Sequence, residues 1–495
     1  GRGRAMTPKD TGPKAKFSQL LPYLLEHKAA LWIAMALSVF GAGISLAQPL
    51  VVGQVITAVQ QKGDLGPIVF LLVAVILGSA VTGGFMYYVL AKAGEGVVFS
   101  ARQKLAHRLL KLPIHEYDLR RTGDLVSRVG SDTTLLRAVL TQGLVDATGG
   151  ALIFFGSLIA MAVIDPLLLG LTLLMIAFAV AAIGLTSRQI RSATTKAQER
   201  VGDMAAAVER ALSAVRTIRA AHAEERETSH IEADAKNAFE QGVKIARLNA
   251  YVTPIAGIAA NGAFIVVLGV GGYRVATGET TVANLVTFIL LMFLMIRPLG
   301  QAFGAYSSVQ AALGALARIQ QILDVPLESD DEHGTASDKR HAVNDVAIEF
   351  ENVEFAYASA PNEDGTPGEA NADVLRGVSF AIKRGQRVAI VGPSGSGKST
   401  TFSLIERFYE PTGGQIRLDG QPVHQLTRSA LREQIGYVEQ DAPVLAGSIR
   451  SNLLIGRPDA TDEQLRDVLA EVNLLGVLER DKRGLDAEVG ENGIM

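Results

Sequence analysis

Six long apolar runs follow one another along the chain up to about residue 306, separated by polar connections of very different length. The runs cover roughly residues 29–56, 67–92, 138–164, 166–187, 249–274 and 282–306. About 20 apolar residues are enough for a helix to cross the hydrocarbon core of a bilayer. The second run, PIVFLLVAVILGSAVTGGFMYYVLA, has no polar face to turn toward water, which argues against a helix in a soluble core. The pattern therefore predicts six membrane-spanning helices, with a tight turn at Asp165-Pro166 between the third and the fourth.

The two long connections, residues 93–137 and 188–248, are themselves patterned as helices. Both are rich in Ala, Leu, Glu, Lys and Arg, with apolar residues at helical spacing and few breakers. Read as paired legs of about 20 residues, they would extend roughly 30 Å from the membrane. Pro113 and Gly123 interrupt the first connection within LPIHEYDLRRTGDLVSRVGSD and predict a short helix lying across its tip. The second connection offers AAAVERALSAVRTIRAAHAEE in the comparable place, although both stretches could also be ordinary solvated amphipathic helices.

Basic residues set the expected orientation. Lys and Arg gather in the lead-in before residue 29 and in the two long connections, whereas the three short connections carry few of them. Cytoplasmic loops carry the excess of Lys and Arg in membrane proteins. We therefore expect a multi-pass protein of the plasma membrane, the cell membrane of a bacterium, with both termini and both long connections in the cytoplasm.

Composition narrows the chemistry. The formal net charge is −3, from 47 basic and 50 acidic residues, and gives no reason to expect a nucleic-acid partner. The chain has no cysteine, which excludes disulfides, thiolate metal sites and thiol catalysis. From about residue 340 onward the sequence reads like an ordinary soluble domain, unlike the apolar part before it.

A phosphate-binding loop opens this soluble part. The stretch GPSGSGKST matches the pattern G-x-x-x-x-G-K-S/T, whose glycines let backbone N–H groups point at phosphate oxygens while Lys398 reaches the β- and γ-phosphates. The preceding RVAIV predicts a strand and the following KSTTFSLIERFY predicts a helix, so the phosphates would lie at a helix N-terminus. The residues expected to hold the nucleotide are Gly392, Pro393, Ser394, Gly395, Ser396, Gly397, Lys398, Ser399 and Thr400.

Two further residues are candidates for the base and the metal. Tyr357 ends the alternating stretch IEFENVEFAY and could stack on an adenine ring, although by itself it would more readily be an ordinary strand aromatic. Gln440 follows QIGYVE, which predicts a short strand leading into a loop, and its amide could reach a metal ion or an attacking water. Glu439 is a rival that strand alternation would turn the other way. Together with the Ser399 hydroxyl, Gln440 is expected to ligate Mg²⁺.

These motifs together resemble a half-transporter of the ABC exporter family, of the multidrug or lipid exporter kind. The pieces that carry the resemblance are the phosphate loop, FENVEFAY, YVEQDAPVLAGSIRSNL, and, in the two cytoplasmic loops, GDLVSRVGSD and VERALSAVRTIRAAHAEE. The resemblance implies a membrane all-α domain of six helices with long cytoplasmic helical extensions, followed by an α/β P-loop nucleotide-binding domain. It implies Tyr357 as the adenine-stacking aromatic and Gln440 as the Q-loop glutamine, with ATP and Mg²⁺ as cofactors.

The resemblance also divides the chain. We expect a transmembrane domain with two coupling loops over residues 17–325, a linker over 326–345, and the N-terminal part of the nucleotide-binding domain over 346–495. Since six spans are few for an enclosed pathway and one phosphate loop is half a site, a dimer with a second half-transporter is expected, either as a homodimer or as a heterodimer. The resemblance implies that the fourth and fifth spans cross to that partner.

The sequence departs from the family pattern in two places. The segment ASAPNEDGTPGEANAD after Tyr357 is longer and more polar than usual, and we expect a mobile surface loop there. The final EVGENGIM corresponds to the run just before the family's signature loop, and Glu491 would fall in the segment that touches the coupling helices. No catalytic residue is therefore expected within these residues, because the base is expected beyond Met495. Hydrolysis by this stretch alone is not expected. We expect the stretch to be part of a longer natural protein, and a natural, non-hydrolytic protein of 495 residues is the alternative.

The function that follows is ATP-driven export of amphipathic small molecules, drugs or lipids, by alternating access. The nucleotide would drive this motion through its different affinity for the inward-open and outward-open arrangements. Two alternatives stay open: an importer of a bulky ligand such as a siderophore on the same fold, and a non-hydrolytic nucleotide-gated channel or regulator.

Polar residues at membrane depth are the candidates for the cargo site. Charges are costly there and are functional suspects by default. Asp146 and Arg297 fall at similar depth in the inner half, and we hypothesise that they face a central cavity and pair, unless they snorkel to the interface. Gln142, Thr253 and Asn261 are weaker candidates of the same kind. With so few charges, amphipathic drugs or lipids fit such a cavity better than peptides or ions.

Overall fold

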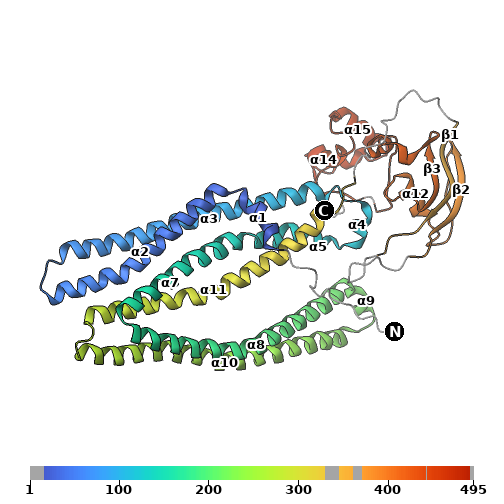
Figure 1. Cartoon of the computed structure of the whole chain (residues 1–495). Helices are drawn as coiled ribbons and strands as arrows, with labels where there is room; N and C mark the ends of the chain where they lie inside the picture. Colours follow the sequence, from blue (N-terminus) through green and yellow to red (C-terminus); the bar gives the residue numbers. More distant parts are fainter. Residues whose placement is uncertain (1–15, 329–344, 360–370, 442, 491–495) are drawn as a thin grey trace. The chain divides into compact units, whose positions relative to one another are not determined.

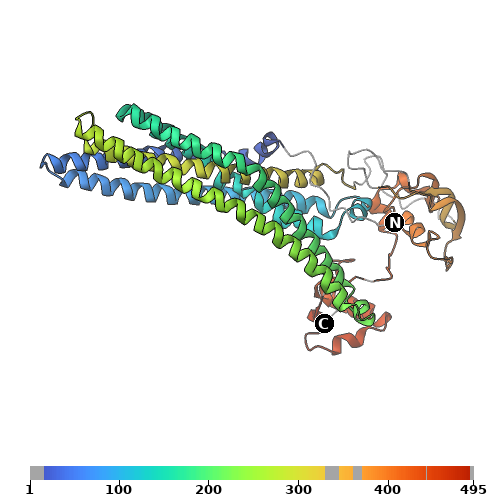
Figure 2. The same cartoon turned by 90° about the horizontal axis from the view of Figure 1, so that it is seen from below.

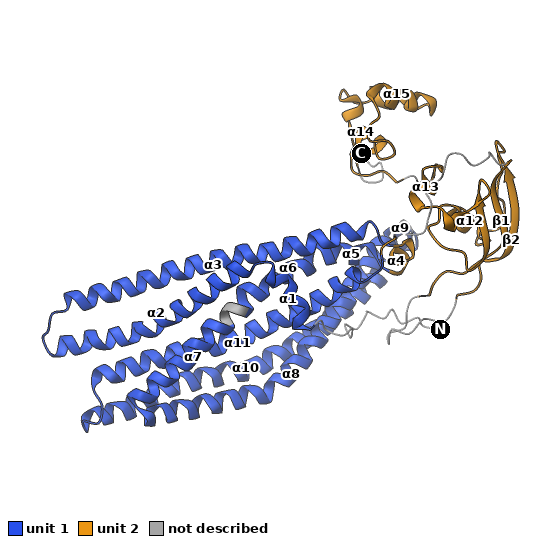
Figure 3. Ribbon diagram, turned by 45° about the horizontal axis from the view of Figure 1, so that its top comes forward, with its two compact units in different colours: residues 1–112, 120–326 blue, residues 113–119, 327–495 orange. Residues whose placement is uncertain are grey.

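The computed structural model describes residues 16–328, 345–359, 371–441 and 443–490. The chain forms two compact units, which we describe separately (Figure 3). Unit 1 comprises Gly1–Leu112 and Arg120–Pro326, and unit 2 comprises Pro113–Leu119 and Leu327–Met495. The short piece that interrupts the first long connection therefore belongs to the same unit as the phosphate loop.

Unit 1 is helical, and its described residues contain six helical segments long and apolar enough to cross a membrane, as predicted. The principal helices are α2 (Lys28–Gln60), α3 (Gly66–Leu109), α7 (Val145–Ile164), α8 (Pro166–Ser213), α10 (Glu224–Ala276) and α11 (Val282–Leu323). The third segment runs from Thr122 to Ile164 and is not a uniform helix. Before α7 it consists of α5 (Thr122–Ser127), the π-helical η1 (Arg128–Asp132), α6 (Thr133–Leu135) and the π-helical η2 (Val139–Leu144). A short N-terminal helix, α1 (Phe17–Leu25), precedes the first span.

The spans pack as neighbours in pairs. Helices α8 and α10 lie side by side along their length, as do α2 and α3 (Figures 1 and 2). A buried cluster that includes Phe288, Met292 and Met295 of α11 joins the spans near the α7–α8 turn. Other large apolar side chains, such as Val163 and Leu185, are 81% exposed on the bare helices. Such surfaces are unusual on a soluble protein and fit contact with lipid.

The turn between the third and fourth spans depends on one buried carboxylate. Asp165 is 2% exposed, and its Oδ1 caps α8 by accepting the N–H groups of Leu167 at 3.1 Å and Leu168 at 3.4 Å. Its Oδ2 accepts from Nε of Arg274, near the end of α10, at 2.8 Å. Pro166 occupies the first helical turn, where the missing N–H costs nothing. The predicted tight turn is thus present, and it also ties α8 to α10.

Both long connections continue the membrane helices and end in short helices, as the pattern predicted. Helix α3 runs without interruption to Leu109, and α4 (Ile114–Leu119) follows Pro113. Helix α8 runs to Ser213, and α9 (Val215–Ala220) separates it from α10. The part of α8 beyond residue 187 has 26 residues and, at 1.5 Å per residue, extends about 39 Å.

Unit 2 contains a four-stranded antiparallel sheet in the order β2-β1-β3-β4. Its strands are β1 (Val346–Phe355), β2 (Leu375–Lys383), β3 (Gly413–Leu418) and β4 (Gln421–Pro422). Helix α12 (Lys398–Ile405) lies against the sheet, and its Leu404 joins Phe350 and Val353 of β1 in the buried core (Figure 1). This core fixes the first turn of α12 beside the end of β1.

A second group of elements completes the unit. The remaining elements are η3 (Val423–Gln425), α13 (Arg428–Arg432), β5 (Gly447–Ser448), α14 (Ile449–Leu453), α15 (Asp462–Glu471), η4 (Leu475–Glu479), η5 (Gly484–Asp486) and β6 (Glu488–Val489). Strand β5 pairs with β6, and Leu465, Leu469 and Leu485 form a separate small core.

Two predicted strands are wrong for the described residues. The stretch RVAIV before the phosphate loop and the stretch before Gln440 belong to no sheet. Val391 is 87% exposed and Val438 is 90% exposed, so neither stretch is covered by a neighbour. A strand exists only through hydrogen bonds to a partner, and β-branched composition cannot supply that partner. In the described structure no such partner lies beside them.

A phosphate loop, its tyrosine neighbours and a cavity between membrane helices

The phosphate loop at residues 392–397 is shaped by glycines at positions that other residues could not occupy. Gly395 and Gly397 have φ values of +80° and +88°. Gly397 is also the N-cap of α12, and a Cβ there would lie 2.7 Å from Cδ2 of Leu375. A side chain at Gly397 would therefore meet both backbone strain and a clash with β2.

The loop offers amide donors at a helix N-terminus. Among the described loop amides, that of Ser396 has a backbone acceptor, Pro393 O at 3.3 Å. The first N–H groups of α12 have no acceptor within the helix, and the helix dipole adds partial positive charge at the same end. The Nζ of Lys398 donates to Gly392 O at 2.8 Å and to Pro393 O at 2.7 Å, which keeps its charge at the loop. This donor set, with the exposed Ser399 hydroxyl beside it, fits the phosphates of a nucleotide with its magnesium ion.

Tyr357 is held beside this loop. It lies two residues after the end of β1, and its hydroxyl is 2.8 Å from Oγ1 of Thr400, in the first turn of α12. Its backbone oxygen accepts from Nδ2 of Asn371 at 3.1 Å. The structure therefore brings the predicted aromatic and the phosphate loop together through a direct contact.

The second predicted metal ligand is not brought to the loop by any contact in the described residues. Gln440 is exposed, in the irregular stretch after α13, and so is its rival Glu439. The strand that was expected to aim their side chains in opposite directions is absent there. Neither residue has a hydrogen bond to residues 392–400 in the part of the chain that the structure describes.

Tyr409 joins the nucleotide side of unit 2 to helix α4. Its hydroxyl donates to the Oδ2 of Asp118, and its ring meets that of Tyr357 edge-on, with centroids 5.2 Å apart. Burial and the neighbouring Asp118 carboxylate raise the pKa of Tyr409, so it stays a hydrogen-bond donor at neutral pH. The chain Thr400, Tyr357, Tyr409, Asp118 thus runs from the first turn after the phosphate loop to the short helix.

A hollow of about 490 Å³ lies beside this chain of contacts, still within unit 2. Pro113 and His115 line it, together with Phe355, Phe408 and Arg428. The contact between Tyr409 and Asp118 could not be predicted from the sequence, because it joins residues 291 positions apart and leaves no local pattern.

Glu406 is a buried carboxylate whose charge is compensated only in part. It is 5% exposed, and its Oε1 has no hydrogen-bond partner among the described residues. Burial raises the pKa of Glu406, and the nearby Arg432 offsets this only in part. The Arg432 guanidinium instead donates to Glu328, with Nη2 at 2.7 Å from Oε1.

Charged residues of the motif GDLVSRVGSD in unit 1 form an ion-pair cluster with Arg318 of α11. Asp124, Arg128 and Asp132 follow one another at four-residue spacing and so lie on one face. Nε of Arg318 is 2.7 Å from Asp132 Oδ2, and its Nη2 is 2.6 Å from Asp124 Oδ1. Arg128, which is 7% exposed, donates to Asp124 and to the backbone oxygen of Arg318 at 2.6 Å. The motif therefore fixes the N-terminal part of the third membrane segment to α11.

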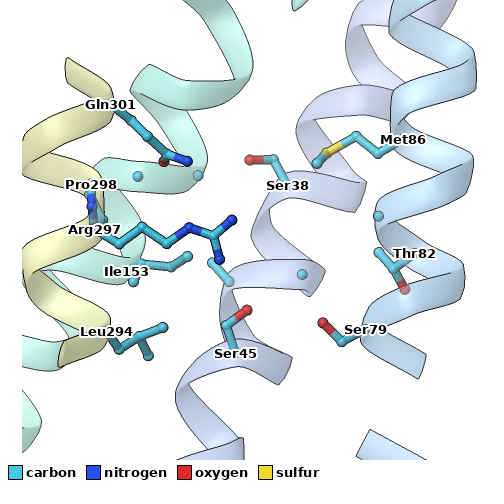
Figure 4. A pocket seen from close by; sticks show the side chains of 15 residues that line it. Ser38, Ser45, Ser79, Thr82, Met86, Ile153, Leu294, Arg297, Pro298 and Gln301 are labelled. Atoms are coloured by element: carbon cyan, nitrogen blue, oxygen red, sulfur yellow. The ribbon is translucent and has the colours of Figure 1, made fainter. Parts of the chain in front are cut away.

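Unit 1 also contains a cavity of about 300 Å³ between α2, α3, α7 and α11 (Figure 4). Its polar wall residues are Ser38, Ser45, Ser79, Thr82, Arg297 and Gln301. Met86, Ile153 and Leu294 add apolar surface, and glycines of three helices leave the space open. The cavity thus combines one cation with hydroxyl groups in an otherwise apolar part of the chain.

The predicted cargo residues are distributed unevenly around it. Arg297 lines the cavity, whereas Gln142 accepts from Ser308 Oγ at 2.5 Å and is not among the lining residues. Thr253 and Asn261 are exposed on α10 and do not line it either. The side chain of Asp146 lies outside the part that the structure describes, as do residues 360–370 of the expected surface loop at 358–373 and the predicted contact residue Glu491.

Six membrane-spanning helices followed by a phosphate loop in a small sheet domain define a membrane transporter fused to its nucleotide-binding domain. The family model described as the ABC transporter transmembrane region matches residues 31–299, and that described as ABC transporter matches residues 375–488. The chain therefore belongs to the ABC transporter family, and the resemblance stated from the sequence is confirmed.

Relatives are similar along most of the chain. An uncharacterized ABC transporter ATP-binding protein, YfiC of Bacillus subtilis, is 27% identical over 496 residues, which are 100% of this chain and 80% of that protein. A multidrug resistance ABC transporter ATP-binding and permease protein of Lactococcus lactis is 29% identical over 473 residues, 93% of this chain and 76% of that protein. The multidrug efflux ATP-binding/permease protein Rv0194 of Mycobacterium tuberculosis is 28% identical over 96% of this chain, which spans 39% of Rv0194. The similarities support ATP-driven transport of the exporter type.

Proposed function

We propose that this chain is one half of a dimer that exports amphipathic small molecules, drugs or lipids, across the plasma membrane. The observation that carries the proposal is the unbroken set of contacts from the first turn of α12 to α4. These contacts connect residues able to bind a nucleotide with α4, the short helix that lies in the sequence between the second and the third membrane segment.

The nucleotide would be bound by the amides of residues 392–400 and by the ammonium of Lys398. Tyr357 would support the adenine ring, and Ser399 and Gln440 would ligate the magnesium ion. Bound ATP with Mg²⁺ supplies free energy to the extent that its affinity differs between the two arrangements of the membrane helices.

Transmission would begin at Tyr357. Its hydroxyl is hydrogen-bonded to Thr400 and its ring contacts the ring of Tyr409. A shift of Tyr357 would therefore move Tyr409, whose hydroxyl donates a hydrogen bond to Asp118. In the sequence, short non-helical segments connect α4 to α3 before it and to α5 after it. A displacement of α4 would therefore reach two spans at once.

The cargo class is proposed from the cavity and from the relatives. Two of the relatives are named for multidrug resistance or multidrug efflux, which supports amphipathic small molecules for this chain. A cavity with apolar and hydroxyl walls is typical of sites for such ligands. One phosphate loop per chain supports a second half-transporter as the partner, the same chain or a related one.

The test is transport in vesicles by the whole protein as its gene encodes it, because hydrolysis is not expected of residues 1–495 alone. ATP should drive a fluorescent amphipathic dye into inside-out vesicles and not into right-side-out vesicles. Lys398→Ala should abolish this uptake, whereas Lys482→Ala, which removes an exposed lysine elsewhere in unit 2, should not. Uptake into right-side-out vesicles would show import, and nucleotide-dependent leakage that follows the gradient would show a channel. Either result would refute export.

A further inference from the structure

Arg297 occupies an unusual position for a charged side chain. It lies 15 residues after the first residue of α11, which at 1.5 Å per residue is about 22 Å along the span. A charge at such depth is costly unless a partner or ligand compensates it. Arg297 has no hydrogen bond or ion pair with any residue whose side chain the structure describes. Its guanidinium extends from α11 into the cavity, between Ser38 and Ser45 of α2 (Figure 4).

The walls opposite Arg297 offer hydroxyls rather than acids. Ser38 is 4% exposed, and its Oγ has no hydrogen-bond partner among the described residues. Ser79 and Thr82 of α3 complete the polar side, and no carboxylate is among the lining residues of the described structure. A buried hydroxyl without a partner costs free energy, and a ligand acceptor would recover it. The Arg297 guanidinium can only donate hydrogen bonds, and the unpaired Ser38 hydroxyl can donate as well as accept, so an acceptor that carries negative charge would satisfy both.

We propose that this cavity recognises the anionic head of an amphipathic cargo, a single carboxylate or sulfonate on an apolar body. The inference rests on the proposed export function, whose cargo class it narrows. The guanidinium can donate two parallel hydrogen bonds to such an oxyanion, and the hydroxyls of Ser38 and Ser45 can meet its remaining lone pairs. A volume of about 300 Å³ is at the small end for ligand sites, which suits a head group better than a whole cargo molecule.

The test uses three probes that share one apolar body and differ in the head. Pyrenebutyrate carries a carboxylate, pyrenebutanol a neutral hydroxyl, and pyrenebutyl-trimethylammonium a cation. Their affinities for the full chain, reconstituted in nanodiscs without nucleotide, are measured from pyrene fluorescence. We expect pyrenebutyrate to bind at least about tenfold more tightly than the other two probes, as for a charge-assisted hydrogen bond. Equal affinity of the three probes would overturn the proposal, and so would a preference for the cation. A guanidinium neutralised by Asp146 would give no anion preference.

Variants of Arg297 assign the preference to the cavity. Arg297→Gln should weaken pyrenebutyrate binding about tenfold and leave the affinity for pyrenebutanol within about twofold of the unaltered protein. Arg297→Lys should have an intermediate affinity for pyrenebutyrate, because the positive charge stays but the two parallel hydrogen bonds of the guanidinium are lost. Arg191→Gln removes an exposed arginine of α8 as a matched control and should change neither affinity. An unchanged affinity of Arg297→Gln for pyrenebutyrate would overturn the proposal.

These experiments distinguish failure of the proposed head-group site from failure of the proposed export function. Export of neutral and cationic dyes with no anion preference in binding would leave the proposed function intact and refute the head-group site. Arg297-dependent binding of pyrenebutyrate without ATP-driven movement of any dye would keep the site and refute export.

Discussion

Removing one hydroxyl, that of Tyr409, should loosen α4 from the rest of unit 2. Tyr409→Phe keeps the ring and its packing against Tyr357 and Phe355, and deletes only the donor to Asp118. The Asp118 carboxylate then loses this hydrogen-bond donor. The substitution therefore isolates a single bond between the short helix and the nucleotide side of the unit.

The size of the effect follows from the bond and its surroundings. A hydrogen bond to a charged group contributes about 1.5–3 kcal/mol. Asp118 is exposed, so water replaces part of the lost interaction, and about 1 kcal/mol is the expected cost. At 25 °C this corresponds to about a fivefold change in the equilibrium between docked and undocked α4.

Hydrogen exchange of the peptide that covers α4 measures this equilibrium directly. The amides of α4 should exchange about fivefold faster in Tyr409→Phe, and the affinity for ATP should stay within about twofold because the ring contact to Tyr357 remains. The matched control is Tyr437→Phe, which removes the hydroxyl of a half-exposed tyrosine whose ring packs on Phe408.

A double-mutant cycle decides whether the bond itself is responsible. Asp118→Ala removes the acceptor and should have a similar effect to Tyr409→Phe, and the two changes together should cost little more than either one. Fully additive effects, or exchange in α4 no faster than in the Tyr437→Phe control, would refute the reasoning.

Substitutions at three other residues test separate parts of the structure. Lys398→Ala should weaken binding of a fluorescent ATP analogue at least about tenfold with an unchanged circular dichroism spectrum, and unchanged affinity would argue against the phosphate loop. Glu406→Gln should stabilise the chain by about 1 kcal/mol at pH 7, because it removes a buried charge that Arg432 offsets only in part. Since the pKa of Glu406 is raised in the folded chain, that gain should vanish as the pH falls toward the ordinary carboxyl value of 4.5, which thermal unfolding at both pH values would show. Arg318→Leu should lower the free energy of unfolding by about 1–3 kcal/mol in detergent, and Arg318→Lys should lower it by less. Equal melting temperatures for the two variants and the unaltered protein would contradict the ion-pair cluster.

The features that were predictable from the sequence depend on neighbours close in the chain. Apolar runs located the six spans, Pro113 located the break before α4, and the spacing of glycines around Lys398 located the phosphate loop. Each of these is a property of a few dozen consecutive residues at most. The local pattern is therefore sufficient for them.

Features that depend on distant partners were missed or mistaken. The stretch RVAIV has the composition of a strand, but a strand also needs a partner, and Val391 has none in the described structure. The bond between Tyr409 and Asp118 and the pairing of Arg318 with Asp132 join residues 291 and 186 positions apart. No periodicity records such pairings, so they could not be read from one sequence.

The division of the chain into units has a topological consequence. The backbone passes between unit 1 and unit 2 three times, at residues 112–113, 119–120 and 326–327, because α4 is folded into unit 2 while both its flanking segments belong to unit 1. Helix α4 is thus joined covalently to unit 1 at both of its ends. A short tether of this kind gives a binding segment an effective concentration in the millimolar range at its binding site. A contact too weak to hold a free peptide can therefore hold α4.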